Sequence, residues 1–223
     1  MFTAVTALLA ASAGLVNAAP AQKRAQTASI TPHESYSSSV GVLGCKINTN
    51  RVAYWPGSVS CNDICVKVRN EGREVHLLKI DSSGGAYDIS YDAWNYLGFG
   101  VSATEDPRQG GGINMEYEFV PAQECVDAGL LEGAGGKLPL TASNSMNYVS
   151  SCMSESGSWV GQNYELYNVM DPVCHWGKDE TCTLDLDVSN QPSCPSGLGS
   201  NEAMGSEYTV WNVQYGTGQL VAA

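Results

Sequence analysis

The chain has 223 residues, and its 23 acidic side chains outnumber 11 Lys and Arg to give a net charge of −12 at pH 7. This charge disfavours binding to nucleic acids and to anionic membrane surfaces, because both need clustered Lys and Arg. Beyond the N-terminal segment, no apolar run approaches the roughly 18 residues that a membrane-spanning helix needs. We therefore expect neither nucleic acid nor membrane among the partners.

The N-terminus has the pattern of a secreted precursor. Residues 1–18 form an apolar run that ends in small residues, which predicts a secretory signal peptide. Lys23 and Arg24 resemble the dibasic site of kexin-type processing proteases, so residues 19–24 are predicted to be a short propeptide. Residues 25–39 are rich in Ser and Thr and are predicted to be a flexible lead-in. We expect a secreted, extracellular protein.

The eight cysteines all follow this N-terminal segment. An even number in a secreted chain predicts four disulfide bonds, and the spacing leaves their connectivity open. No spacing matches a zinc site and paired cysteines leave no reactive thiol, so we expect no metal and no cofactor. The predicted disulfide-forming residues are Cys45, Cys61, Cys65, Cys125, Cys152, Cys174, Cys182 and Cys194.

Residues 40–127 have the alternation of a β module. Strands are expected at 64–69, 75–80 and 113–119, and a short helix at 91–97 with Ser90 as its N-cap. The run at 75–80 is mostly apolar, which favours a strand buried on both faces. In 113–119, apolar and polar residues alternate strictly, as in a half-buried strand.

Residues 128–223 are expected to form a C-terminal extension of mixed α and β structure. Apolar residues at helical spacing predict an amphipathic helix at 159–170 that ends before Pro172. Alternation at 182–188 and at 211–215 predicts two further strands. Together with the module at 40–127, this predicts two parts tied by disulfides.

The stretch KIDSSGGAYDISYDAW resembles the signature of barwin, expansin and rare lipoprotein A type proteins, and the layout is similar to secreted fungal members. The matching positions are Asp81, the Gly84-Gly85 turn, the run Tyr87 to Ser90, and Trp94. The resemblance implies a mainly β fold: a six-stranded double-psi β-barrel over residues 40–127 with a disulfide-tied α+β extension. It also places Asp88 where cellulase-like and lytic relatives have a catalytic acid.

Three departures from these families bear on catalysis. Expansin-like proteins carry a His before the aromatic-Asp pair, whereas here Tyr87 directly precedes Asp88. They also carry a Cys two residues after the first Asp, where this chain has Ser83. The first strand of hydrolytic relatives supplies a second carboxylate, but the matching stretch INTNRVAYWP has neither Asp nor Glu. An inverting hydrolase needs two carboxylates, so double-carboxylate hydrolysis is disfavoured. Asp88 is then expected to cap the helix or line a groove.

The candidate binding residues surround this signature. Tyr54 and Trp55 precede Pro56, which favours partly exposed loop aromatics that stack well on sugar rings, and the alternative is an aromatic of the core or rim. The full candidate set is Tyr54, Trp55, Asp81, Tyr87 and Asp88. With Asp88 only a candidate catalytic residue, we expect a non-hydrolytic binding protein or effector that recognises a cell-wall polysaccharide or a host extracellular component.

Two alternatives remain open. The first is an inhibitor of papain-like cysteine proteases, a role held by some similar small barrels, which would use exposed loops such as ATEDPRQGGG at 103–112. Disulfides would hold such a loop in its binding conformation. The second is a lytic glycan-cleaving enzyme that uses Asp88 as a single acid/base.

Overall fold

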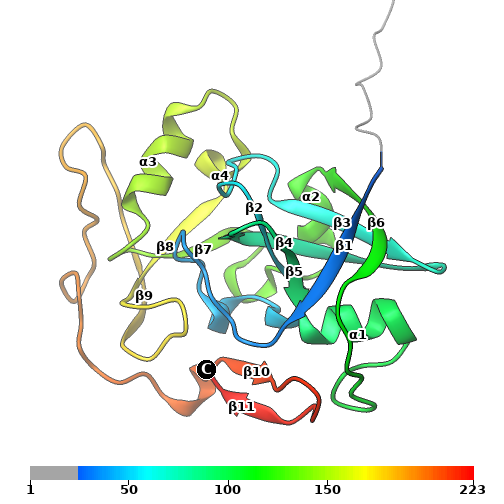
Figure 1. The fold of residues 1–223 in the computed structure, drawn as a ribbon. Coiled ribbons are helices and arrows are strands. Elements are labelled where there is room, and N and C mark those ends of the chain that lie inside the picture. The colour runs from blue at the N-terminus through cyan, green and yellow to red at the C-terminus, as the bar shows by residue number, and fades with distance from the viewer. Residues whose placement is uncertain (1–24) are drawn as a thin grey trace, which may run out of the picture.

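The computed structural model describes residues 25–223, in which a closed six-stranded β-barrel is joined to a smaller β-sheet and a C-terminal hairpin (Figure 1). The predicted signal peptide and propeptide lie outside the described residues. Around the barrel the strand order is β1-β5-β2-β4-β3-β6. The bounds are β1 Gln26–His33, β2 Val52–Pro56, β3 Cys65–Asn70, β4 Arg73–Ser83, β5 Tyr87–Ser90 and β6 Ile113–Val120.

The barrel mixes parallel and antiparallel pairing. β1 runs parallel to β5, and β2 runs parallel to β4. The remaining neighbours, β1 with β6, β2 with β5, β3 with β4 and β3 with β6, are antiparallel. Closure leaves no free edge strand in the barrel, so the backbone groups of every strand have partners on both sides.

The first barrel strand lies in the segment predicted to be a flexible lead-in, and that prediction is wrong. β1 pairs with β5 through Ile30 opposite Tyr87 and with β6 through Ala28 opposite Met115. Ile30 is fully buried inside the barrel. The barrel therefore begins near residue 26 rather than 40, because pairing on both sides compensates for a Ser- and Thr-rich composition.

The helix predicted after the signature stretch is confirmed as α1 (Tyr91–Phe99). It ends at Gly100, whose φ of 80° is the left-handed conformation that glycine adopts easily. Ser90 is the N-cap residue, but its side chain makes no capping hydrogen bond. The indole Nε1 of Trp94 donates to the carbonyl of Ile30 at 3.2 Å, which fastens α1 to β1.

The C-terminal half contains a three-stranded sheet, β7-β8-β9, and a separate hairpin, β10-β11. The bounds are α2 Ala122–Asp127, β7 Leu138–Thr141, α3 Met146–Ser154, α4 Trp159–Gln162, β8 Tyr164–Val169, β9 Gly177–Cys182, β10 Trp211–Val213 and β11 Leu220–Ala222. Short 3₁₀ turns lie at Gly44–Lys46, Thr49–Arg51, Glu132–Ala134 and Ser206–Tyr208.

Two predictions for this half are corrected. The helix expected at 159–170 is a single turn, α4, followed by strand β8, which is paired on both sides. The strand expected at 182–188 ends at Cys182. Beyond Cys182, the carboxylate of Asp185 accepts a hydrogen bond from the backbone N–H of Asp187, and this bond stabilises a turn in place of the expected strand. The strand expected around Trp211 is confirmed as β10.

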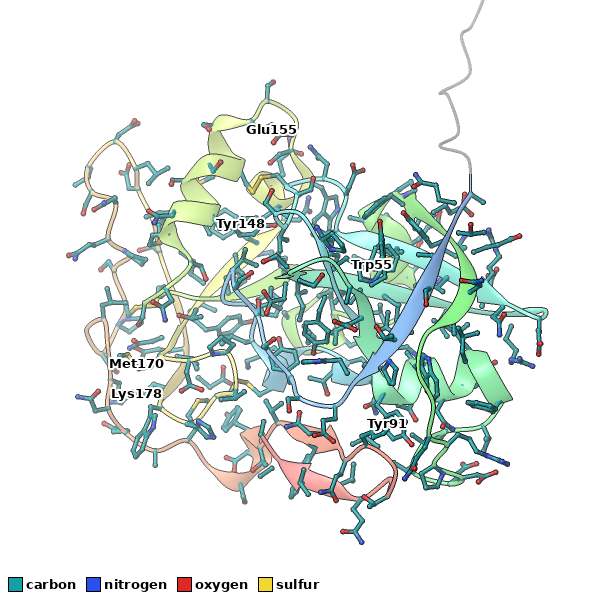
Figure 2. The ribbon with its side chains drawn as sticks, viewed as in Figure 1. Trp55, Tyr91, Tyr148, Glu155, Met170 and Lys178 are labelled. Carbon is teal, nitrogen blue, oxygen red and sulfur yellow. A yellow bond between two sulfur atoms is a disulfide. The ribbon has the colours of Figure 1, made fainter. Side chains whose placement is uncertain are left out.

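Two hydrophobic clusters join the halves. One fills the barrel and includes Trp55 and Leu77, and Figure 2 shows Trp55 within it. The other lies outside the barrel wall and includes Leu78 and Ile80 of β4 with Leu166 of β8. β4 is thus buried on both faces, as its apolar pattern predicted, and the C-terminal half packs directly on the barrel.

All eight cysteines are paired, as the even count predicted. Two bonds tie the barrel half to the C-terminal half, and the other two lie within one half each. The pairs are Cys45–Cys174, Cys61–Cys152, Cys65–Cys125 and Cys182–Cys194. Four disulfides are typical of proteins that fold in an oxidising compartment.

Candidate functional site

Asp81 and Asp88 of the signature stretch lie in one row across four barrel strands, whereas its third acid, Asp92, lies in α1. Thr31 of β1 is in register with Asp88 of β5, Asp88 with Tyr54 of β2, and Tyr54 with Asp81 of β4. Side chains in register on neighbouring strands share a face. Adjacent strands are about 4.8 Å apart, so Asp81 and Asp88 are separated by the width of two strand spacings, with Tyr54 between them.

Asp88 is half-buried and accepts a hydrogen bond from the hydroxyl of Thr31. Within residues 25–223, the hydrogen bond of its carboxylate goes to Thr31 rather than to the backbone of α1, and the N-cap position belongs to Ser90. The expected capping role is therefore not what the structure shows. The carboxylate instead ties β5 to β1 on the outer face of the barrel.

Asp81 holds the segment that follows β1. Its carboxylate accepts hydrogen bonds from the hydroxyl of Ser37 and from the backbone of Ser82, each at 2.7 Å. The hydroxyl of Ser38 donates to the carbonyl of Ile80 at 2.9 Å. These hydrogen bonds fasten Ser37 and Ser38 to β4, at the Asp81 end of the row.

Tyr54 and Trp55 do not lie on a loop, and this prediction is corrected. Both belong to strand β2, with only 5% and 1% of their surfaces exposed. Tyr54 points outward and packs against the ring of His33, 4.6 Å between centroids. Burial raises the pKa of the Tyr54 hydroxyl, with a smaller contribution from the nearby charge of Asp81. Neither ring offers a face on which a sugar can stack.

Trp55 and Tyr87 belong to an aromatic cluster inside the barrel. The Trp55 ring lies 5.2 Å from that of Tyr87 and 4.7 Å from that of Tyr117, edge to face. Burial raises the pKa of Tyr117 to about 12. Within residues 25–223, the indole Nε1 of Trp55 is buried and has no hydrogen-bond partner. These aromatics stabilise the barrel rather than form a surface.

A hollow of about 510 Å³ lies beside the row, and we call it the β1 groove. Tyr215 forms part of its wall and keeps 37% of its surface exposed. The Tyr215 hydroxyl accepts from the backbone N–H of Gly110 at 2.7 Å and donates to the Gly110 carbonyl at 2.9 Å. The residues that line the groove are Thr31, Pro32, His33, Glu34, Ser35, Gly110, Gly111 and Tyr215.

Sequence reasoning missed Tyr215 and Glu34. The backbone N–H of Tyr215 donates to the carboxylate of Glu34 at 2.7 Å, across 181 residues of sequence. The stretch INTNRVAYWP, expected to be the first strand, ends in β2, and the observed first strand, β1, contains no Asp or Glu. Glu34, however, follows it directly and places a carboxylate in the groove. The alternation around residue 215 was the only sequence signal for this surface.

The C-terminal hairpin forms this groove by packing against the end of the barrel. The backbone N–H of Tyr36 donates to the side chain of Asn212 at 2.8 Å, and that of Gly216 donates to the Tyr91 hydroxyl at 3.3 Å. Figure 2 shows Tyr91 close to the hairpin. The extension thus lines the groove instead of filling it.

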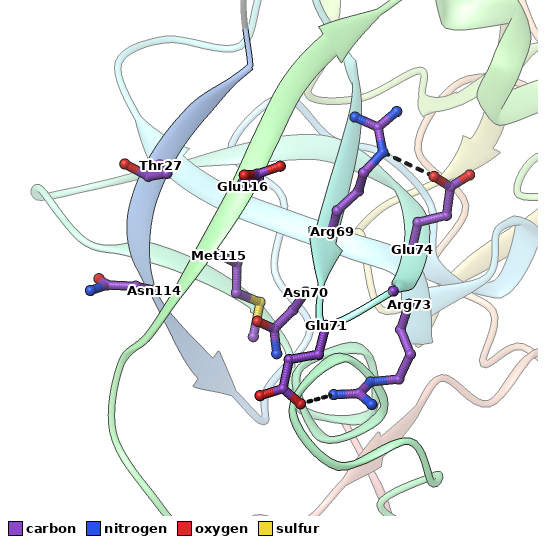
Figure 3. A pocket seen from close by; sticks show the side chains of 10 residues that line it. Thr27, Arg69, Asn70, Glu71, Arg73, Glu74, Asn114, Met115 and Glu116 are labelled. Atoms are coloured by element: carbon purple, nitrogen blue, oxygen red, sulfur yellow. Dashed lines mark hydrogen bonds and ion pairs between the residues drawn. The ribbon is translucent and has the colours of Figure 1, made fainter.

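Another hollow, of about 590 Å³, lies at the β3-β4 turn (Figure 3). Its cations are already paired: Arg69 contacts Glu74 at 3.0 Å, and Arg73 contacts Glu71 at 2.9 Å. The hydrogen bond that Arg69 donates to the Glu74 carboxylate raises the pKa of the guanidinium. No aromatic side chain lines this hollow, so it is a weaker candidate for sugar binding.

Comparison with protein-family models and with curated proteins found no match to this chain. Within residues 25–223, no group of His, Cys, Asp or Glu side chains is arranged to hold a metal ion. None of the helices in that range is both long and apolar enough to cross a membrane. The candidate site therefore depends on its geometry alone.

Proposed function

We propose that this is a secreted, non-hydrolytic protein that binds an extracellular polysaccharide in the β1 groove. The observation that carries this proposal is the position of Tyr215. Two hydrogen bonds to Gly110 fix its hydroxyl, and its ring remains partly exposed beside the groove. An amphipathic ring held in this way can stack on the apolar face of a sugar with little loss of conformational freedom.

We also propose that the barrel has the double-psi topology of the barwin, expansin and rare lipoprotein A type. The two parallel strand pairs in a closed six-stranded barrel support this, as does the position of the signature stretch from β4 through β5 into α1. Secretion is supported by the four disulfide bonds.

A pull-down with insoluble chitin, cellulose, β-glucan and peptidoglycan tests the binding function. We expect the wild type to sediment with at least one of them, and Tyr215→Ala to bind about tenfold more weakly because stacking is lost. Trp176→Ala is the matched control, since Trp176 is exposed but does not line the groove. Absence of binding to all four polymers would overturn the proposal.

The same experiment separates binding from lytic cleavage. A non-hydrolytic protein releases no soluble fragments during the incubation. Fragment release that is lost in Asp88→Asn, with sedimentation retained, would assign the lytic reaction to Asp88 in place of simple binding.

One observation favours protease inhibition as a second candidate function: the loop 101–112 is held rigidly. The fully buried side chain of Asn95 donates to the carbonyls of Val101 and Asp106, each at 3.0 Å, and accepts from the backbone of Arg108 at 2.9 Å. Asp92 accepts from the backbone of Ala103 at 2.9 Å. Pre-organisation of this kind lowers the entropic cost of entering a protease cleft.

Inhibition of papain by the purified protein tests this second candidate. If the loop enters the cleft, Arg108→Ala should weaken inhibition by about tenfold, because it removes an exposed side chain but none of the backbone bonds of the loop. Arg69→Ala, on the β3-β4 hairpin, is the control and should inhibit like the wild type. A wild type that leaves papain fully active at micromolar concentration excludes this function.

A further inference from the structure

The C-terminal segment supplies an aromatic side chain to a second hollow as well. Trp211 of β10 is 49% exposed and lines a hollow of about 360 Å³ between the hairpin and the turns that precede β2. We call it the hairpin hollow. It is lined by Gly44, Cys45, Ile47, Thr49, Asn50, Glu207, Thr209, Val210, Trp211 and Leu220.

The two hollows share the same chemistry. Each has one exposed aromatic ring, one glutamate and several small or hydroxyl-bearing residues: Tyr215 with Glu34 in the β1 groove, and Trp211 with Glu207 in the hairpin hollow. Neither is lined by Lys or Arg. The hollow at the β3-β4 turn differs, because it has two arginines and no aromatic.

The cations nearest in sequence to the two hollows are paired with acidic side chains. Arg51, next to Asn50, pairs with Asp92 at 2.8 Å. Arg108, two residues before Gly110, pairs with Asp106 at 2.5 Å.

Lys46, between two lining residues of the hairpin hollow, forms an ion pair with Asp179 at 2.5 Å and lies over the ring of Tyr167. In the β1 groove, His33 is the one lining residue that can gain a positive charge, and its ring packs on Tyr54. The available charge in both hollows is therefore negative.

The two aromatic residues are close enough to contact one polymer. Trp211 and Tyr215 are four residues apart, so their Cα atoms are separated by no more than about 14 Å. Both belong to the hairpin region, which Figure 1 shows along the end of the barrel below α1. A short stretch of a glycan chain spans such a distance.

We propose that the β1 groove and the hairpin hollow together bind a cationic amino-sugar polymer, one rich in glucosamine with free amino groups. Tyr215 and Trp211 stack on sugar rings, while Glu34 and Glu207 accept hydrogen bonds from the ammonium groups. The net charge of −12 attracts such a polymer at long range and repels polyuronates. This inference rests on the proposed function, since it names the polysaccharide class that the same surface selects.

Calorimetric titration of the full chain with three soluble oligosaccharides tests the inference: a fully deacetylated glucosamine hexamer, its N-acetylated counterpart and an oligogalacturonate. At about pH 6, glutamate carboxyls are ordinarily ionised. We expect the deacetylated hexamer to bind about tenfold more tightly than the acetylated one, and the oligogalacturonate not to bind. Added salt should weaken binding of the deacetylated hexamer only.

Charge-removing variants locate the site. Glu34→Gln and Glu207→Gln should each weaken binding of the deacetylated hexamer about two- to fivefold, as expected for an exposed ion pair, and leave the acetylated hexamer unaffected. Trp211→Ala should weaken both ligands about tenfold. Glu116→Gln is the matched control, because Glu116 lines the hollow at the β3-β4 turn and its loss changes the net charge equally.

The possible results separate the two proposals. Equal binding of both hexamers, or an equal effect of Glu116→Gln and Glu34→Gln, overturns the cationic selectivity and leaves polysaccharide binding standing. Failure of every glycan to bind overturns both. Binding that survives Trp211→Ala unchanged removes the hairpin hollow from the site.

Discussion

The double variant Cys45→Ala/Cys174→Ala is expected to lose about 4 kcal/mol of unfolding free energy. The bond joins residues 129 apart and links the barrel half to the C-terminal half. Because Cys61–Cys152 also links the two halves, the shortest loop that the Cys45–Cys174 bond closes contains about 40 residues. In the chain-entropy account, opening that loop gives the unfolded state more conformations and so stabilises it.

Urea unfolding, followed by tryptophan fluorescence, measures this change. Cys182→Ala/Cys194→Ala is the control, because that bond closes a loop of only 12 residues and its entropic contribution is about 3 kcal/mol. The barrel-to-extension bond should therefore have the larger effect. A loss below about 1 kcal/mol for the Cys45–Cys174 pair would contradict this entropic account of the bond.

Alkali is the condition expected to destabilise the fold most steeply. Burial raises the pKa of Tyr36 well above its usual value and also raises that of Tyr54. The Tyr36 hydroxyl donates to the carbonyl of Val42 at 2.7 Å, which requires the protonated form. Below about pH 10, both hydroxyls keep their protons in the folded and the unfolded chain, and their contribution to stability is fully present.

Above about pH 10, the unfolded chain releases these protons and the folded chain does not. Each tyrosine then lowers the free energy of unfolding by about 1.4 kcal/mol per pH unit, and the pair by about 3 kcal/mol per pH unit. Tyrosinate absorbance measures ionisation of the tyrosines, and circular dichroism measures unfolding. If Tyr36 and Tyr54 ionise only when the chain unfolds, their ionisation should occur at the same pH as the loss of the circular dichroism signal. Tyr54→Phe should reduce the slope. Ionisation of all tyrosines in a chain that remains folded would contradict this prediction.

Local patterns were sufficient for several elements. α1 follows from the spacing of Ala93, Trp94 and Leu97 with Gly100 after it, and β6 follows from strict alternation. The apolar run in β4 predicted burial on both faces, and the even number of cysteines predicted four bonds. Each of these features depends on residues that are near one another in the chain or on a simple count.

Other elements depended on distant partners. β1 has few apolar residues, and its strand conformation is stabilised by β5 and β6 on either side. β8 has apolar residues at helical spacing, but pairing with β7 and β9 makes it a strand. Tyr54 and Trp55 were expected on a loop because Pro56 follows, although the strand continues through Pro56.

Composition and short-range periodicity were enough to predict the acidic charge, the four disulfide bonds and the strands β4 and β6. The tertiary structure decided which side chains reach the surface together. It buried Tyr54 and Trp55, packed the partly buried Tyr87 against Trp55, and brought Tyr215 to Glu34 across 181 residues. A binding surface depends on packing between segments that are distant in the chain. Here the C-terminal hairpin packs on the end of the barrel through hydrogen bonds such as Tyr36 to Asn212 and Gly216 to Tyr91, which short-range sequence periodicity does not predict.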